Sequence, residues 1–223
     1  MTTDIMGSLK QFKVFCVGPY KTGTTSVHRF FQSYNLRTYH GPRWVFWCKP
    51  RRAHRLDDFD CFSDGMKHPI AFLFDRYPNA KFIYTKRDIR DWMISRHMHR
   101  RGRSKRLYYY FLILIGIKQW SGVQFRDEEV KKWPQEYHDH EKRVFDFFEG
   151  KRNCLLLIDL SNDLPEDIAR RIHEFLNLPG EPHEFPKKNV APNSLRAFSE
   201  QAVDRVLREV SLQDPEGGCP TSC

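Results

Sequence analysis

The chain has 223 residues, of which 40% are hydrophobic and 14% aromatic, which suits a folded globule with a sizeable core rather than a disordered chain. Its formal net charge of +9 favours an anionic partner, such as a nucleotide, a sulfated or phosphorylated ligand, nucleic acid or an acidic membrane surface. The six cysteines show no paired C-x-x-C spacing, which argues against a zinc site. The first residues contain no apolar signal segment, so we expect reduced cysteines and a cytoplasmic location.

Residues 12–31 predict a strand, a tight glycine loop and a helix. The apolar run at residues 14–17 is typical of a strand buried on both faces, and it ends at Gly18. Apolar residues then recur at helical spacing, which predicts a helix from about Thr24. Such a loop directs backbone N–H groups inward at a helix N-terminus, where they and the helix dipole favour an anion. The segment therefore predicts a phosphate site, with an ordinary Gly-Pro turn as the structural alternative.

The loop differs from the G-x-x-x-x-G-K-[ST] motif of nucleotide triphosphatases. Gly18 and Gly23 match that spacing, but Thr24 stands at the lysine position and Lys21 precedes the second glycine. No hydroxyl directly follows a lysine at the start of the helix, where it would bind Mg²⁺. We therefore expect the loop to hold a phosphate-type group with a lysine and hydroxyls, without a metal ion.

The rest of the chain alternates between strand and helix patterns. Further strands are expected at residues 36–40, 80–85 and 154–158. Residues 61–65 are interpreted as a loop. Helical patterns fall at residues 70–74, from about 90 to 98, and at 128–148, 168–176 and 199–212. This alternation predicts an α/β fold with three α/β/α layers around a central, mainly parallel sheet, in one domain over residues 1–212 with a flexible tail over 213–223.

Two basic stretches and one apolar stretch are candidate contact surfaces. Residues 41–55 mix aromatic and cationic side chains, which can bind nucleic acid or a sugar-like acceptor. We favour a partly buried surface helix whose arginine stems cover aromatic rings. The apolar run at 107–117 is shorter than the ~20 residues that span a bilayer, so a buried element is expected there. With the basic run before it, a peripheral membrane contact over residues 96–117 is the less favoured alternative.

A second strand-to-helix junction carries cations. The strand at 80–85 runs into Lys86 and Arg87, ahead of a helix beginning near Arg90. In open parallel sheets, ligands bind beyond the carboxyl ends of the strands. We therefore expect Arg87 and the loop of Lys21 to face a single nucleotide.

Two motifs together resemble the sulfotransferase family. Residues 18–26, GPYKTGTTS, resemble the loop with which that family holds the 5′-phosphosulfate of 3′-phosphoadenosine 5′-phosphosulfate (PAPS). Residues 82–92, FIYTKRDIRDW, followed by Ser95, resemble its 3′-phosphate site, although Ile89 stands where proline is common. Residues 137–148 also resemble the family's helix before its LLLIDL-type strand, and residues 175–189 resemble its FLG…FP..N ending. The resemblance covers about residues 12–190.

The resemblance implies a PAPS site and a set of catalytic roles. Lys21 is expected to stabilise charge on the leaving phosphate and the bridging oxygen. For the base that takes the acceptor's proton, Asp64 is the first choice, although it also fits a turn residue, and His40 and His68 are the alternatives. The expected PAPS-binding residues are Tyr20, Lys21, Thr22, Gly23, Thr24, Thr25, Ser26, Arg87 and Ser95. An ion pair of Arg87 with Asp88 or Asp91 is the structural alternative for that arginine.

The sequence therefore predicts a PAPS-dependent sulfotransferase that acts on a hydroxyl or amine of a small-molecule or sugar-like acceptor, without a metal. The alternatives are a P-loop kinase or NTPase, which would require magnesium, and a non-catalytic protein that binds a nucleotide or polyanion. A nucleic-acid binder is disfavoured, because no recognition module is visible. Nothing in the sequence indicates an oligomeric state or selects one acceptor.

Overall fold

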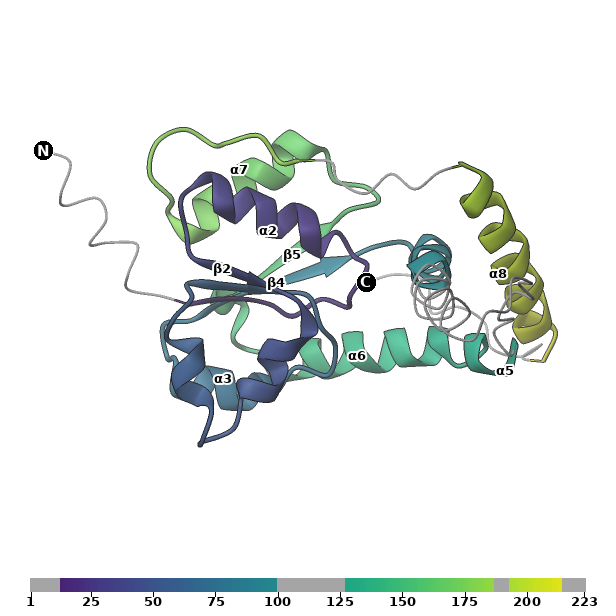
Figure 1. Ribbon diagram of the computed structural model, residues 1–223, viewed down its shortest axis with the longest axis horizontal. Helices are drawn as coiled ribbons and strands as arrows, with labels where there is room; N and C mark the ends of the chain where they lie inside the picture. The colour runs from purple at the N-terminus through teal and green to yellow at the C-terminus, as the bar shows by residue number, and fades with distance from the viewer. Residues whose placement is uncertain (1–12, 100–126, 187–192, 214–223) are drawn as a thin grey trace, which may run out of the picture. The chain divides into compact units, whose positions relative to one another are not determined.

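The computed structural model describes residues 13–99, 127–186 and 193–213 (Figure 1). The chain divides into two compact units, of which the first comprises Met1–Arg87 with Tyr137–Asn189 and the second Asp88–Glu136 with Val190–Cys223. The apolar run at 107–117 and the tail from residue 214 lie outside the described residues. The single domain over residues 1–212 stays a prediction.

A five-stranded sheet forms the centre of the first unit. Its strands are β1 (Val14–Cys16), β2 (Thr38–His40), β3 (Cys61–Ser63), β4 (Lys81–Lys86) and β5 (Leu155–Asp159). They lie in the order β2-β3-β1-β4-β5, and every neighbouring pair is parallel. The predicted α/β fold with a parallel sheet is confirmed. Because β1 lies in the middle, the loop that follows it is flanked by the ends of β3 and β4.

Alternation of side chains along the strands supplies an apolar layer on both faces of the sheet. In β1, Val14 and Cys16 join one core cluster, and Phe15 joins the other. In β4, Ile83 joins the first cluster and Phe82 the second. Successive residues of a strand point to opposite faces, so each short strand contributes to both cores. This explains why the strands are continuous apolar runs, as expected for a parallel sheet covered on both sides.

Helices cover the two faces. Figure 1 shows α2 (Thr24–Ser33) and α7 (Pro165–Leu176) on one side of the sheet and α3 (Ile70–Arg76) with α6 (Trp133–Phe148) on the other. Helices α2 and α7 pack through Val27, Phe30, Phe31, Ile168 and Ile172, all buried in the first cluster. Within the first unit, the three-layer arrangement predicted from the sequence is therefore present. Short 3₁₀ helices η2 (Pro42–Trp47), η3 (Ala53–Leu56) and η4 (Arg152–Cys154) join the elements.

Two interpretations of the sequence need correction. Residues 61–65 were expected to form a loop, but Cys61–Ser63 is strand β3, which pairs with both β1 and β2. Three residues are too few to show periodicity, so only tertiary pairing identifies this strand. The segment 41–55 was expected to be one surface helix, and it forms the two 3₁₀ helices instead. Pro50, between the two, lacks the N–H group that the interior of a continuous helix needs.

The second unit is helical in the residues that the structure describes. It contains a helix at residues 89–99, α5 (Asp127–Val130), the start of α6 and α8 (Asn193–Gln213). Arg90 binds Asp204 through two hydrogen bonds of 2.7 and 2.9 Å, which joins the first of these helices to α8. His97 and Ser199 make a buried contact of 2.9 Å between the same helices. Among the described residues, no helix is long and apolar enough to cross a membrane.

Candidate phosphosulfate site

The glycine loop (residues 17–23) has the backbone of an anion cradle. Lys21 and Gly23 both take left-handed conformations, with φ of 72° and 71°. Residues that alternate between right- and left-handed conformations direct successive N–H groups to the same side. Gly23 is the N-cap of α2, and within the described residues no side chain caps that helix. The helix dipole therefore adds a positive partial charge at the place where the loop N–H groups converge.

Close packing fixes the two glycines that bracket the loop. A Cβ on Gly18 would lie 2.3 Å from the backbone oxygen of Thr85, at the end of β4. A Cβ on Gly23 would lie 2.3 Å from Cδ1 of Leu160, in the connection between β5 and α7. At Gly18 the obstacle is backbone, which cannot move away easily. At Gly23 it is the tip of a flexible leucine side chain, so the left-handed φ of 71° is the stronger constraint there. The spacing noted in the sequence thus reflects contact of the loop with its neighbours on both sides, in addition to backbone conformation.

Thr22 holds the loop together internally. Its side chain is fully buried and donates a hydrogen bond of 2.5 Å to the carbonyl of Pro19. Its hydroxyl also lies 2.8 Å from that of Thr85, which must be the donor because the proton of Thr22 is already used. Thr22 was predicted to bind the donor nucleotide, and this geometry limits such a role to its backbone N–H. Thr24 and Ser26 are also buried, whereas Lys21 and Thr25 are partly exposed.

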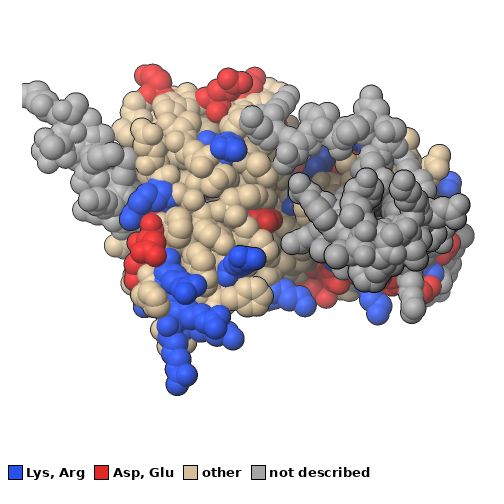
Figure 2. All heavy atoms as spheres, viewed as in Figure 1, with Lys and Arg blue, Asp and Glu red and all other residues tan. Residues whose placement is uncertain are grey.

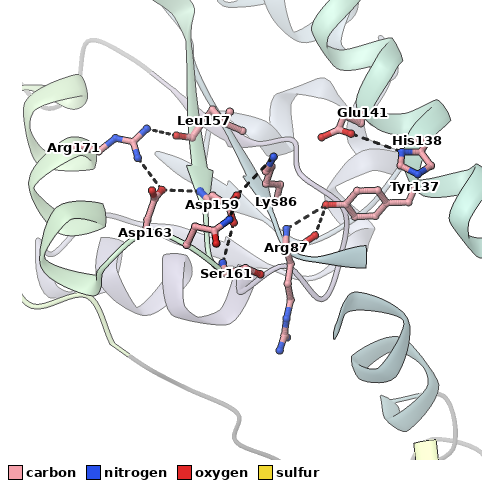
Figure 3. Close-up of polar contacts among 11 residues, drawn as sticks. Lys86, Arg87, Tyr137, His138, Glu141, Leu157, Asp159, Ser161, Asp163 and Arg171 are labelled. Carbon is pink, nitrogen blue, oxygen red and sulfur yellow. Dashed lines mark hydrogen bonds and ion pairs between the residues drawn. The ribbon is translucent and has the colours of Figure 1, made fainter. Parts of the chain in front are cut away.

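The connection between β5 and α7, which carries Leu160, is braced by hydrogen bonds (Figure 3). Asp159 accepts hydrogen bonds from the Ser161 backbone and the Asn162 side chain, and it forms an ion pair of 3.7 Å with Lys86. Burial raises the pKa of the Asp159 carboxyl, but the bonds from Asn162 and Ser161 outweigh it and leave that pKa below its usual value. Arg171 binds Asp163, which accepts a bond from the Asp159 N–H. These bonds hold the backbone of the connection that carries Leu160.

Asp64, the first candidate for the base, lies beside the start of α2. It follows β3 and has a left-handed backbone with φ of 73°, a conformation that aspartate adopts more readily than most residues. The Thr24 hydroxyl donates to its Oδ1 over 3.4 Å. Its carbonyl accepts a 2.7 Å hydrogen bond from the Trp44 indole, which is buried. These contacts hold the carboxylate at the same edge of the sheet as the glycine loop.

His40 lies at the same edge of the sheet, at the end of β2. Its Nε2 is 3.3 Å from the Thr25 hydroxyl, and its Nδ1 is 2.9 Å from the Ser63 hydroxyl. Burial lowers its pKa, and nearby Lys21 lowers it further, while Asp64 acts in the opposite direction. His40 is therefore neutral near pH 7. Its location groups two of the three base candidates with Lys21.

His68, the third candidate, is set back in the core. It is only 3% exposed and its ring stacks on Trp44 at 5.1 Å. Within the described residues neither ring nitrogen makes a hydrogen bond of good geometry, although the Val17 carbonyl is near. Burial, and then the neighbouring His140, hold its pKa well below the usual value. A side chain so enclosed is poorly placed to meet an acceptor, so the structure favours Asp64 or His40.

His140 is a site residue that the sequence did not indicate. It lies on α6, is buried, and its Nε2 donates a 2.8 Å hydrogen bond to the carbonyl of Val17 at the start of the glycine loop. Its Nδ1 accepts a 2.8 Å hydrogen bond from Arg143, which fixes the ring tautomer. Burial lowers the pKa of His140 to about 4, so the ring stays neutral. In the sequence His140 is only one histidine within a helical pattern, and such a pattern cannot indicate a partner 123 residues away.

Arg87 follows β4 at the same edge. Its backbone N–H and carbonyl both bond the Tyr137 hydroxyl, at 3.2 and 2.9 Å, and its guanidinium points away from that tyrosine (Figure 3). Because β1 and β4 are neighbours, the structure brings Arg87 and the glycine loop to one edge of the sheet, as predicted. Ser95 lies in the helix at residues 89–99, which belongs to the second unit. The pairing of Ser95 with Arg87 therefore stays a prediction.

Metal-ligating residues do not cluster in the part of the chain that the structure describes: no group of three or more His, Cys, Asp or Glu side chains there could hold an ion.

The fold and the loop define an α/β protein with an anion cradle at the carboxyl edge of a parallel sheet. Comparison with known families identifies the class: residues 13–193 match the family described as the sulfotransferase domain, and the chain belongs to this family. A solved structure, a sulfotransferase from Alicyclobacillus acidocaldarius, is similar at 18% identity with a TM-score of 0.48, over 89% of this chain and 95% of that one. A search of curated proteins gives no significant match.

Proposed function

We propose that the chain transfers a sulfuryl group from PAPS to a hydroxyl or amine of an acceptor. The observation that carries the proposal is the glycine loop, in which left-handed Lys21 and Gly23 shape a cradle for an anion at the N-terminus of α2. The S–O bond to the 5′-phosphate breaks, a new bond forms from sulfur to the acceptor oxygen or nitrogen, and the 3′,5′-bisphosphate leaves. The acceptor's proton passes to a base on the protein.

Each role falls to a residue at the carboxyl edge of the sheet. Lys21 and the N–H groups of the loop stabilise the negative charge that develops on the leaving phosphate. Asp64 takes the proton, positioned by the Thr24 hydroxyl and by the buried Trp44. Arg87 binds the 3′-phosphate together with Ser95. The charge stabilisation comes from the protein, so the reaction is proposed to need no metal.

Binding of the reaction product tests the donor site directly. We expect 3′-phosphoadenosine 5′-phosphate to raise the melting temperature with increasing concentration, equally with and without magnesium, because it binds the folded state alone. Lys21→Ala and Arg87→Ala should each weaken this shift. A shift with ATP and magnesium, and none with the bisphosphate, would establish a kinase or NTPase instead. The absence of any shift in a folded wild-type protein would contradict the proposal.

A further inference from the structure

The segment from Gly41 to Leu56, here called the basic arm, holds more than half of the protein's net positive charge. It contains no Asp or Glu and therefore contributes +5 of the formal +9. The five cations are Arg43, Lys49, Arg51, Arg52 and Arg55, and all are exposed. Figure 2 shows Lys and Arg side chains gathered at the lower left, over the segments drawn around α3 in Figure 1.

The arm is held firmly against the first unit. Four of its own residues are buried against that unit, namely Trp44, Cys48, Ala53 and Leu56, and Trp44 and Leu56 are fully enclosed. Trp44 packs on Phe15 of β1 at 5.7 Å. The cations are thus displayed on a fixed backbone, so that binding a ligand orders their side chains but not the backbone.

The charges of the arm are not neutralised within the described protein. The neighbouring Arg37 and Arg76 each form an ion pair, with Asp60 at 2.7 Å and Asp57 at 3.0 Å. The five cations of the arm form none in the part of the chain that the structure describes. Among them stands Phe46, which is 62% exposed. Unpaired cations around an exposed ring leave both groups available to a ligand.

The arm runs from the catalytic edge of the sheet to the opposite edge. At its start, the Gly41 N–H bonds the carbonyl of Ser63, and Trp44 bonds the carbonyl of Asp64. At its end, the carbonyl of Leu56 accepts a 2.9 Å bond from Lys13, the residue before β1. Because the parallel strands all begin at one edge of the sheet and end at the other, the arm extends along the strands from the edge where they end to the edge where they begin. A ligand that follows the arm reaches the base candidate at one end.

We propose that the basic arm binds a linear acidic polysaccharide and leads one of its hydroxyls to Asp64 and Lys21. This inference rests on the proposed sulfuryl transfer and names its class of acceptor. Four of the five cations are arginines, whose planar guanidinium groups bind carboxylates through paired hydrogen bonds. The negative face of the Phe46 ring attracts the polarised C–H groups of a sugar ring. A polysaccharide supplies both partners, and it also carries the hydroxyls that sulfuryl transfer requires.

Other polyanions match these features less well. A membrane is planar and offers no acceptor chain that can extend to the edge of the sheet. Single-stranded nucleic acid is held by several aromatic side chains on which successive bases stack. Phe46 is the one large aromatic residue of the arm that is strongly exposed, since Trp44 is buried and Trp47 is half-buried.

Charge reversal on the arm tests the proposal against a control with the same net charge. The probe is a hyaluronan decasaccharide, an unsulfated chain with a carboxylate in every second sugar. We expect Arg51→Glu with Arg52→Glu to weaken its binding at least tenfold. Lys132→Glu with Arg208→Glu, at two exposed positions of the second unit, should weaken it less than threefold. The thermal shift with 3′-phosphoadenosine 5′-phosphate should be the same in both variants, since neither pair belongs to the donor site.

Each other outcome has a definite meaning. Equal weakening by the two pairs would show general charge attraction and overturn the proposal. Tighter, arm-dependent binding of a single-stranded DNA of equal charge, or of vesicles rich in phosphatidylserine, would assign the arm to that partner instead. Arm-dependent binding of the decasaccharide without any bisphosphate shift in the wild type would contradict the sulfotransferase proposal and the acceptor role, and would leave a polysaccharide-binding surface.

Discussion

The glycine loop and the basic arm are both suited to anions, but they are built in opposite ways. The loop presents backbone N–H groups and turns Thr22 inward toward Pro19 and Thr85, while Lys21 is partly exposed. The arm buries its apolar residues and presents charged side chains outward. A backbone site depends on conformation and close packing, whereas a side-chain surface distributes affinity over several residues. Single substitutions should therefore have large effects in and around the loop and small effects on the arm.

The largest expected effect concerns the base. Asp64→Asn should lower kcat for sulfuryl transfer about 1000-fold, because the amide cannot take the acceptor's proton. Asparagine tolerates the left-handed conformation of this position, so the fold should persist. Steady-state rates and titration with the bisphosphate measure the two effects separately. Activity retained in this variant but lost in His40→Asn would transfer the role of base to His40.

Lys21 should come next. Lys21→Ala is expected to lower kcat about 100- to 1000-fold, the effect of removing one group that stabilises the developing charge. Lys67→Ala is a matched control, since Lys67 is an exposed lysine with a left-handed φ of 60°. Rate measurements on both variants isolate the role of the ammonium group from that of the backbone. Equal rates in the two variants would remove Lys21 from the mechanism.

Gly18 tests the packing of the loop. Gly18→Ala should lower the free energy of unfolding by about 3 kcal/mol, because its Cβ meets the backbone of Thr85. Gly150→Ala is the comparison: its φ is 73° and nothing lies within 4 Å of the added atom, so only backbone strain of about 1 kcal/mol is expected. Urea denaturation measures both. A smaller loss at Gly18 than at Gly150 would show that the loop can move away from β4.

His140 links the stability of the fold to pH. Its pKa is lowered to about 4 by burial, against 6.5 in an unfolded chain, so the unfolded state binds more protons between these values. Stability from this group is fully present above pH 6.5 and is lost as the pH falls toward 4. At pH 5 the loss amounts to about 2 kcal/mol relative to pH 7.

Replacement of His140 should remove this dependence. His140→Gln keeps a donor near the Val17 carbonyl but does not titrate, so its free energy of unfolding should fall less between pH 7 and pH 5. Urea denaturation at the two pH values gives the comparison. Identical pH profiles for the variant and the wild type would show that other groups, among them His68, carry the effect.

The smallest effect is expected for one cation of the arm. Arg55→Ala should change the free energy of unfolding by less than about 0.5 kcal/mol, because this exposed side chain has no ion-pair partner in the described residues. Binding of the decasaccharide should weaken only about two- to threefold, since exposed charge contacts are individually weak. A tenfold loss from this single change would mean that the arm contains one dominant contact.

The sequence predicted those strands and helices that are marked by an apolar run or by apolar residues at helical spacing. Strands β1, β4 and β5 are apolar runs bounded by turn residues, and helix α2 follows from its apolar spacing. Strand β3 was missed because its three residues are defined by hydrogen bonds to β1 and β2 rather than by pattern. Arg87 and the glycine loop lie at the same edge of the sheet, because β1 and β4 are parallel neighbours. That they face a single nucleotide stays a prediction.

The site was predictable in its backbone and less so in its side chains. The spacing of Gly18 and Gly23 indicated a tight loop, and the structure shows a left-handed Gly23 and a close backbone contact at Gly18. That this loop binds an anion stays a prediction. The inward direction of Thr22 depends on Thr85, 63 residues away. The contact of His140 with the loop likewise depends on the docking of α6. No local pattern in the sequence contains such distant partners.

The central position of β1 also determines when during synthesis the loop can form. Val14 pairs with Cys61 on one side and with Lys81 on the other, so both neighbours emerge from the ribosome long after β1 itself. Parallel pairing also requires a crossover to be closed before any of its hydrogen bonds can form. A nascent chain that ends before Lys86 lacks the Thr85 backbone against which Gly18 packs. The loop after β1 is thus made before the strands that flank it but becomes competent for binding only after them.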